Sequence, residues 1–153
     1  MSDMVRDQIS ITSDTRYLST IREFISRMIH QSALPPEEGN KVILAVDEAV
    51  TNIIEHGYEN VANGPIDISV EFDTALFRVI VRDSGRRFNP DTIADPDIME
   101  HVRLGKKKGL GIFLMRQIMD EVLYNFREGS RNELHLIKYV GPPAEQPKGP
   151  SPV

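Results

Sequence analysis

The segment from Val42 to Tyr58, VILAVDEAVTNIIEHGY, constrains the fold of this chain more than any other stretch. Apolar residues recur in it every three or four positions, which predicts an amphipathic helix that packs one face on a core. The residues expected on this apolar face are Val42, Ile43, Val46, Val50, Ile53 and Ile54.

A polar row runs along the same predicted helix. Glu48, Asn52 and His56 recur every four residues and fall outside the apolar face, so they line up on one side. Ala45 and Ala49 lie beside them, and small neighbours leave room for another group to approach the carboxylate and the amide. On an arbitrary helix such a row is a solvated face. Other parts of the chain must therefore decide whether it has a function.

Two later stretches bear on that question. In VIVRDSGRRFNP, from Val79 to Pro90, a strand ends at Asp83 and enters a turn that contains Gly85. In KKKGLGIFLMRQIMDEV, from Lys106 to Val122, a basic loop with glycines opens a helix. In chain order the three patterns are E-x-x-x-N-x-x-x-H, D-x-G-x-x-F-x-P and G-L-G-I-x-L-M-R-Q-I-M-D-E-V.

These patterns resemble the N, G1 and G2 boxes of the GHKL ATP-binding superfamily, and the third is most similar to that of the anti-sigma-factor serine kinases. The resemblance extends from about Val5 to about Val140. It implies a Bergerat-type α/β fold, an α+β two-layer sandwich. Its sheet is mixed and mostly antiparallel, is covered on one face by helices, and is completed by an ATP lid. It further implies an ATP-binding anti-sigma factor that forms a homodimer, binds a sigma factor, and phosphorylates a serine of a STAS-type anti-sigma-factor antagonist.

The resemblance also implies roles for particular residues. Glu48 matches the general base that accepts the proton of the partner's serine, and Asn52 matches the Mg2+ ligand. His56 would support the pocket mouth or only solvate the helix end. Asp83 matches the acid that binds the adenine amino group, and Gly85 lets the backbone pass close to the base. Taken alone, Asp83 would more simply cap its own turn.

The phosphates of ATP would be bound where the third pattern begins. Glycines at the start of a helix expose backbone N–H groups to an anion, and the lysines before them could close over the triphosphate. A run of lysines is otherwise only a solvated loop. The residues assigned to the phosphates are Lys106, Lys107, Lys108, Gly109, Leu110 and Gly111.

One position departs from the family. Arg87 stands where most members have a second glycine, which leaves open whether nucleotide affinity and kinase activity are retained. A binding module of the same fold, which holds a sigma factor or another regulator without transferring phosphate, is therefore the alternative. A detached histidine-kinase catalytic domain is disfavoured, because the chain is expected to be one domain without a phosphoacceptor hairpin. His30 does not fit a phosphoacceptor, since it lies one turn before a proline pair and lacks an adjacent acid.

The 153 residues suffice for one domain, expected over residues 1–140, and the proline-rich residues 141–153 are expected to form a disordered tail. The absence of cysteine excludes disulfides and thiolate sites and agrees with a cytoplasmic location. No apolar run approaches the ~20 residues of a membrane span. A net charge of -5 argues against nucleic acid as a partner.

Periodicity predicts the remaining elements. Residues 89–108 show little periodicity, which is typical of a lid or a partly disordered segment. The helices expected besides that of Glu48 span residues 14–32 and 109–120, and the strands expected are 4–12, 66–72, 76–82, 122–127 and 134–140.

Overall fold

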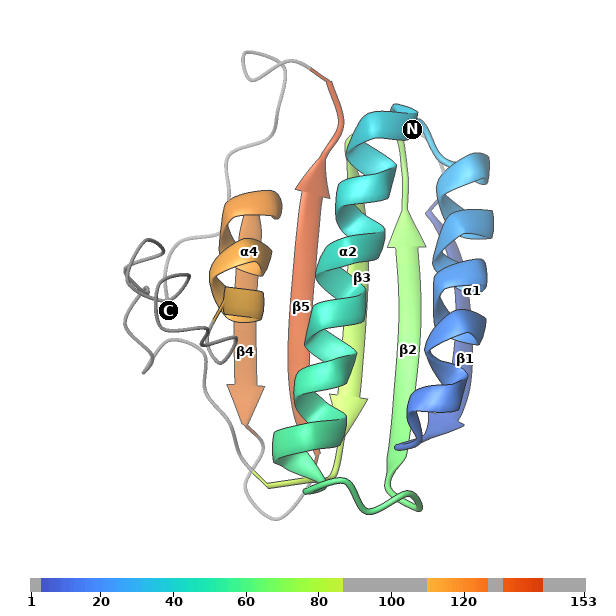
Figure 1. The fold of residues 1–153 in the computed structure, drawn as a ribbon. Coiled ribbons are helices and arrows are strands. Elements are labelled where there is room, and N and C mark those ends of the chain that lie inside the picture. Colours follow the sequence, from blue (N-terminus) through green and yellow to red (C-terminus); the bar gives the residue numbers. More distant parts are fainter. Residues whose placement is uncertain (1–3, 87–109, 127–130, 142–153) are drawn as a thin grey trace.

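A computed structural model describes residues 4–86, 110–126 and 131–141 of the chain, and its strands form one sheet with helices on a single face (Figure 1). The helical elements are a 3-10 turn at Thr15–Tyr17, α1 (Leu18–Gln31), α2 (Pro36–Asn52), a π-helical turn η2 (Ile53–Gly57) and α4 (Leu110–Ile118). The strands are β1 (Val5–Thr12), β2 (Pro65–Phe72), β3 (Leu76–Asp83), β4 (Glu121–Phe126) and β5 (Asn132–Tyr139).

The sheet has five strands in the order β1-β2-β3-β5-β4, and all four pairings between them are antiparallel. The predicted two-layer fold, with a mostly antiparallel sheet and helices on one face, is confirmed. The predicted edge strand at the N-terminus is β1. The last strand along the chain, β5, lies between β3 and β4. The expected lid at residues 89–108 falls outside the described residues.

Side chains alternate along each strand, so one face of the sheet packs under the helices and the other stays open. On β2, for example, Ile66, Ile68 and Val70 are fully buried against the helices, whereas Asp67 and Ser69 between them are half-buried. The helices contribute the other half of the core. Its buried members from α1 are Ile21, Phe24, Ile25, Met28 and Ile29, and those from α2 and η2 include Val42, Val46, Val50, Ile53 and Ile54.

The two alanines of α2 differ from expectation. Ala45 and Ala49 are 0% and 2% exposed and belong to the core. Helix α2 packs against both α1 and α4, and small side chains allow neighbouring helices to approach closely. The room that the alanines create is therefore filled by packing and does not open beside the polar row.

Lys138 near the end of β5 fixes the relative direction of α2 and α4. Its Nζ donates to the carbonyl oxygen of Ile118, the last residue of α4, at 2.8 Å. The same ammonium lies 3.1 Å from Oε2 of Glu38 in the first turn of α2. The end of α4 thus lies beside the start of α2, so the two packed helices run in opposite directions. At about 1.5 Å per residue, the start of α4 reaches roughly the level of Glu48.

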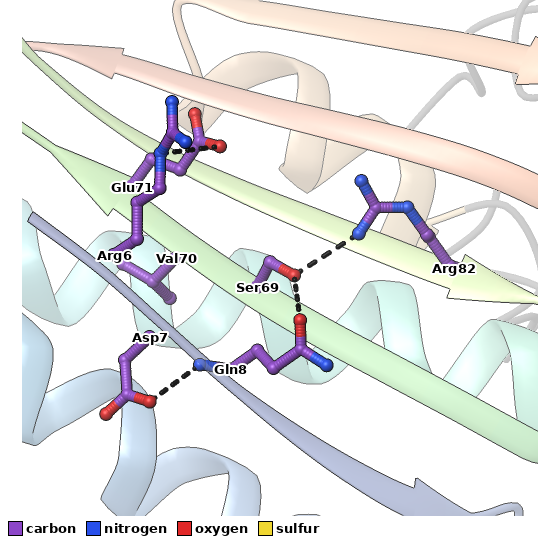
Figure 2. A pocket seen from close by; sticks show the side chains of 7 residues that line it. All are labelled: Arg6, Asp7, Gln8, Ser69, Val70, Glu71 and Arg82. Atoms are coloured by element: carbon purple, nitrogen blue, oxygen red, sulfur yellow. Dashed lines mark hydrogen bonds and ion pairs between the residues drawn. The ribbon is translucent and has the colours of Figure 1, made fainter. Parts of the chain in front are cut away.

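The open face of the sheet carries mostly charged and polar side chains, which surround a hollow between β1, β2 and β3 (Figure 2). Ile80 and Ile137 also point to this face, yet they are only 4% and 2% exposed. Ile80 lies between Arg78 and Arg82 on β3, and arginine stems cover apolar surface well. None of the described helices is long and apolar enough to cross a membrane.

Candidate functional site

The polar row of α2 ends in a change of helix type. Beyond Asn52 the chain continues into the π turn η2, closed by the N–H of Tyr58, which donates to the carbonyl of Ile53 at 2.9 Å. Single π turns inside or at the end of helices are common at functional sites. Here the turn carries His56, which is half-buried, and brings Gly57 against the residues that follow β3.

Glu48 and Asn52 are both half-buried, and neither side chain makes a hydrogen bond or ion pair with any of the described residues. Burial, followed by the negative charges of Asp47 and Glu55, raises the pKa of Glu48 above its ordinary value. A carboxylate in this setting holds a proton more readily than an exposed one, and its oxygens are available to a ligand. The arrangement is suited to a proton acceptor.

Asp83 lies at the end of β3 and is 3% exposed. Its Oδ1 accepts hydrogen bonds from the N–H of Gly85 at 2.8 Å and from Nδ2 of Asn132 at 3.1 Å. Its Oδ2 receives none from the described part of the chain. Burial raises the pKa of Asp83, and the bonds from Asn132 and Gly85 act in the opposite direction. One oxygen of this carboxylate is thus held by the protein, which leaves the other for a donor on a ligand.

Gly85 joins the turn after β3 to the end of the α2 row. A Cβ built on Gly85 would lie 2.7 Å from the carbonyl carbon and oxygen of Gly57, so no side chain fits there. The next residue, Arg86, donates its N–H to the same carbonyl at 2.7 Å. The first two sequence patterns, far apart in the chain, therefore meet backbone to backbone.

Asn132 is a residue of this site that sequence reasoning missed. It opens β5, is 4% exposed, and its Nδ2 donates to Asp83 Oδ1 and, at 3.0 Å, to the carbonyl oxygen of Gly85. It lies directly opposite Asp83 in the sheet. The sequence could have indicated Asn132 only if the pairing of β3 with β5 had been known, because the two residues are 49 positions apart. Tyr124 on β4 is close enough that, after burial, the charge of Asp83 contributes to raising its pKa.

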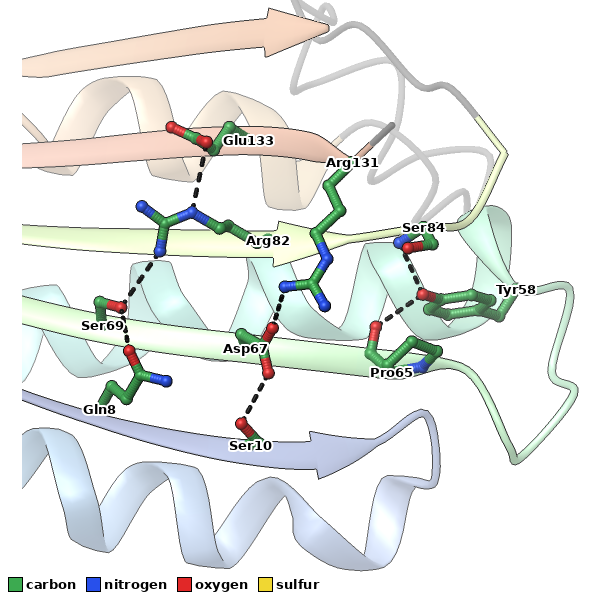
Figure 3. A network of polar contacts seen from close by, with 10 residues as sticks. All are labelled: Gln8, Ser10, Tyr58, Pro65, Asp67, Ser69, Arg82, Ser84, Arg131 and Glu133. Carbon is green, nitrogen blue, oxygen red and sulfur yellow. Dashed lines mark hydrogen bonds and ion pairs between the residues drawn. The ribbon is translucent and has the colours of Figure 1, made fainter. Parts of the chain in front are cut away.

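Tyr58 links three segments at this end of the sheet (Figure 3). Its hydroxyl accepts the N–H of Ser84 at 2.7 Å and donates to the carbonyl oxygen of Pro65 at 2.6 Å. A Cβ on Gly64 would lie 2.4 Å from the tyrosine ring. Tyr58 thus ties the end of η2 to the turn that contains Gly85 and to the start of β2. This residue too was not predicted.

The third pattern is described only in part. Leu110 and Gly111 form the start of α4, which runs toward the first turn of α2, so the beginning of α4 faces the Glu48 half of that helix. Arg87, where the sequence departs from the family, lies outside the described residues. So do the remaining residues assigned to the phosphates, which are Lys106, Lys107, Lys108 and Gly109. His30 is exposed, and its Nδ1 lies 2.7 Å from the carbonyl oxygen of Ser26.

The side chains at this site fit a metal ion that arrives bound to a nucleotide better than one that the protein holds by itself. Among the described residues no group of three or more His, Cys, Asp or Glu side chains could hold an ion. Asn52 offers an amide oxygen that has no partner in the described part of the chain, and Mg2+ commonly takes one or two protein ligands and completes its shell with phosphate oxygens and water.

Comparisons with known proteins agree with the geometry. Residues 11–138 match the family described as the histidine kinase-like ATPase domain. The chain is also 35% identical over 123 residues to the anti-sigma F factor of Bacillus thuringiensis (strain Al Hakam), and that alignment covers 80% of this chain and 84% of the relative. The same figures apply to the anti-sigma F factors of Bacillus mycoides (strain KBAB4) and Bacillus cereus (strain AH187).

The chain therefore belongs to the histidine kinase-like ATPase domain family, within the anti-sigma regulatory group of the GHKL superfamily. The resemblance expected from the three sequence patterns is confirmed at the level of the family. The roles of individual site residues stay predictions.

Proposed function

We propose that this protein is an ATP-dependent serine kinase and anti-sigma factor that phosphorylates a STAS-type antagonist. The observation that carries the proposal is the direct contact between Gly85 and Gly57. It joins the buried acid Asp83 to the helix that carries Asn52 and Glu48, whose carboxylate has no partner in the described part of the chain. The proposed adenine-binding acid, Asp83, and the proposed general base, Glu48, therefore belong to one packed unit.

The adenine of ATP would bind at Asp83. Because Asn132 and the Gly85 N–H occupy Oδ1, the remaining oxygen is the acceptor for the exocyclic amino group. Guanine presents a carbonyl oxygen in place of that amino group, which predicts selectivity for ATP over GTP. Gly85 lies too close to Gly57 for any side chain, so packing within the protein already requires a glycine in this turn.

The triphosphate would extend from there toward the start of α4. Backbone N–H groups of Leu110 and Gly111 open that helix, and the positive end of a helix dipole favours an anion. Lys106, Lys107 and Lys108 supply positive charge directly before it in the sequence. Asn52 would hold a Mg2+ ion that neutralises charge on the phosphates.

Transfer requires a base for the incoming hydroxyl. The serine oxygen of the antagonist attacks the γ-phosphorus, the bond from that phosphorus to the bridging oxygen breaks, and ADP leaves with that oxygen's electron pair. Glu48 accepts the serine proton. Its raised pKa brings this carboxylate closer to the working pH, where a base is most effective.

The partners are inferred from the relatives, which are named anti-sigma F factors. On this basis the protein holds a sigma factor, and the resemblance of the third sequence pattern implies an anti-sigma-factor antagonist as its second partner. We further propose a homodimer of one domain over residues 1–140, with the proline-rich residues 141–153 as a disordered tail.

The experiment that tests this function is a transfer assay with radiolabelled ATP, Mg2+ and purified candidate antagonists encoded near its gene. Labelled phosphoserine on an antagonist is the expected result. Arg87 in place of the usual glycine favours a second candidate, a binding module that captures a sigma factor without transferring phosphate. Capture of a sigma factor without labelling of any antagonist would establish that candidate instead.

A further inference from the structure

The hollow on the open face of the sheet has a volume of about 320 Å3 (Figure 2). Its polar side chains come from β1, β2 and β3. Arg82 and Asp83 are consecutive on β3 and so point to opposite faces, which separates this hollow from the proposed nucleotide site. The side chains that line it from the open face are Arg6, Gln8, Ser69, Glu71 and Arg82.

The carboxylate in the hollow is already engaged on both oxygens. Oε1 of Glu71 lies 3.5 Å from Nε of Arg6, and Oε2 accepts a hydrogen bond from Nη1 of Arg78 at 3.2 Å. Asp7 also borders the hollow, but alternation along β1 directs its side chain to the other face, and Figure 2 shows its carboxylate turned away from Arg82. The acidic groups around the hollow therefore offer little to a ligand.

The unused hydrogen-bonding groups are donors. Arg82 donates from Nε to Glu133 and from Nη1 to Ser69, each at 3.2 Å, which leaves its Nη2 without a partner among the described residues. Oε1 of Gln8 accepts from Ser69 at 3.5 Å, and its Nε2 is likewise unused within the described chain. Arg6 pairs with Glu71 through Nε, and both of its terminal nitrogens are without a partner among the residues that the structure describes.

We propose that this hollow binds a small oxyanion, a ligand that carries a carboxylate or phosphate group. Hydrogen-bond donors that have no acceptor within the described part of the protein favour a ligand with several acceptor oxygens. A guanidinium group can donate two parallel hydrogen bonds to the two oxygens of a carboxylate or phosphate. Glu133 and Ser69 already hold Arg82 in place, so little side-chain freedom is lost when the ligand binds. Two arginines, at positions 6 and 82, and two acids, at positions 7 and 71, line the hollow, so its selectivity for an anion rests on the donors that have no partner among the described residues and on the turning of Asp7 to the other face.

The test is an NMR titration of the 15N-labelled full chain with sodium phosphate and, separately, sodium succinate, each compared with sodium chloride at equal ionic strength. The expected result is a saturable shift of the amides of Gln8, Ser69 and Arg82 that chloride does not produce. A shift with one of the two anions alone identifies which oxyanion the hollow takes.

Gln8→Glu places a carboxylate in the hollow next to Ser69, which Arg82 also contacts, with almost no change in shape, and we expect it to weaken oxyanion binding by at least about tenfold. Arg6→Gln, at a side chain that is 70% exposed, should weaken binding as well without endangering the fold. The matched control is Arg131→Gln, because Arg131 is bound to Asp67 and does not line the hollow. It should bind like the parent.

Three results would overturn the proposal. One is a response no larger than that to chloride, and another is equal binding by Gln8→Glu and the parent. The third is a set of shifts confined to the end of α2 and the start of α4, because the anion would then occupy the proposed phosphate site and not the open face. None of these results bears on whether the protein transfers phosphate.

Discussion

At the scale of single residues, the environment of Glu48 separates it from the other acids on the helix surface. Asp47, its neighbour, is paired with Arg22 at 2.7 Å, whereas Glu48 has no such partner among the described residues and is half-buried. A half-buried carboxylate without a nearby cation lowers the stability of the fold, so stability gives no reason for its position. A role in proton transfer gives a reason for it.

Replacing Glu48 by alanine should therefore impair transfer and spare nucleotide binding. We expect Glu48→Ala to bind ATP like the parent while phosphoryl transfer falls by roughly 10²- to 10⁴-fold, the usual effect of losing a positioned base. Asn52→Ala is the contrasting variant, because loss of a Mg2+ ligand should lower ATP affinity as well. Calorimetry and the transfer assay measure both. An undiminished transfer rate in Glu48→Ala would remove the assignment of the base.

The pH dependence of transfer gives a second test of Glu48. The base acts only when ionised, so kcat/KM should fall as the pH drops through the pKa of Glu48, which lies above its ordinary value. Glu55 is exposed and contributes a like charge to that shift. Glu55→Gln should therefore move the acidic limb of the profile to lower pH. A limb that stays in place would mean that another group controls it.

The hydrogen bonds of Asp83 predict the effect of an amide at that position. In Asp83→Asn the new oxygen would accept from Asn132 and Gly85, which directs the NH2 group toward the adenine amino group. Two donors would then face each other. A buried mismatch of this kind costs about 1 to 3 kcal/mol, or about one to two decades in Kd. Calorimetry with ATP and GTP measures it, and an unchanged Kd for ATP would place the base elsewhere.

At the scale of elements, periodicity was sufficient to predict the helices and strands. The pattern of apolar residues predicted α1, α2 and all five strands to within a few residues, because each buries one regular stripe or face. The π turn was not predictable, because the spacing of apolar residues does not distinguish a π turn from one more turn of α-helix. Asn132 was not predictable either, because its role depends on the register between β3 and β5.

Tyr58 offers a test of how η2 supports the turn after β3. Tyr58→Phe removes the hydroxyl that bridges the Ser84 N–H and the Pro65 carbonyl, while the ring stays on Gly64. We expect a loss of roughly 1 to 3 kcal/mol in stability, measured by urea unfolding, and weaker ATP binding as the turn loosens. Tyr17→Phe is the control, because the hydroxyl of Tyr17 joins no described hydrogen bond. ATP affinity equal to the parent's would show that Gly85 holds the turn without Tyr58.

At the scale of the whole molecule, the described elements from β1 to β5 account for one continuous core. Deletion of Pro142 to Val153 removes only a polar, proline-rich segment by composition. We therefore expect Tm and ATP affinity to stay close to those of the full chain, because such a segment buries little apolar area. Differential scanning calorimetry measures this. A fall of many degrees would show that the segment packs on the domain.

The place of β5 has a consequence for the order of events during synthesis. This strand is the last of the five to leave the ribosome, yet it occupies an interior position between β3 and β4 and carries Asn132 to Asp83. A nascent chain that ends before residue 131 has its helix of Glu48 and its strand of Asp83, but Asp83 lacks its buried donor. If Asp83 binds the adenine as proposed, this recognition is completed only when β5, the last of the described strands, pairs with β3.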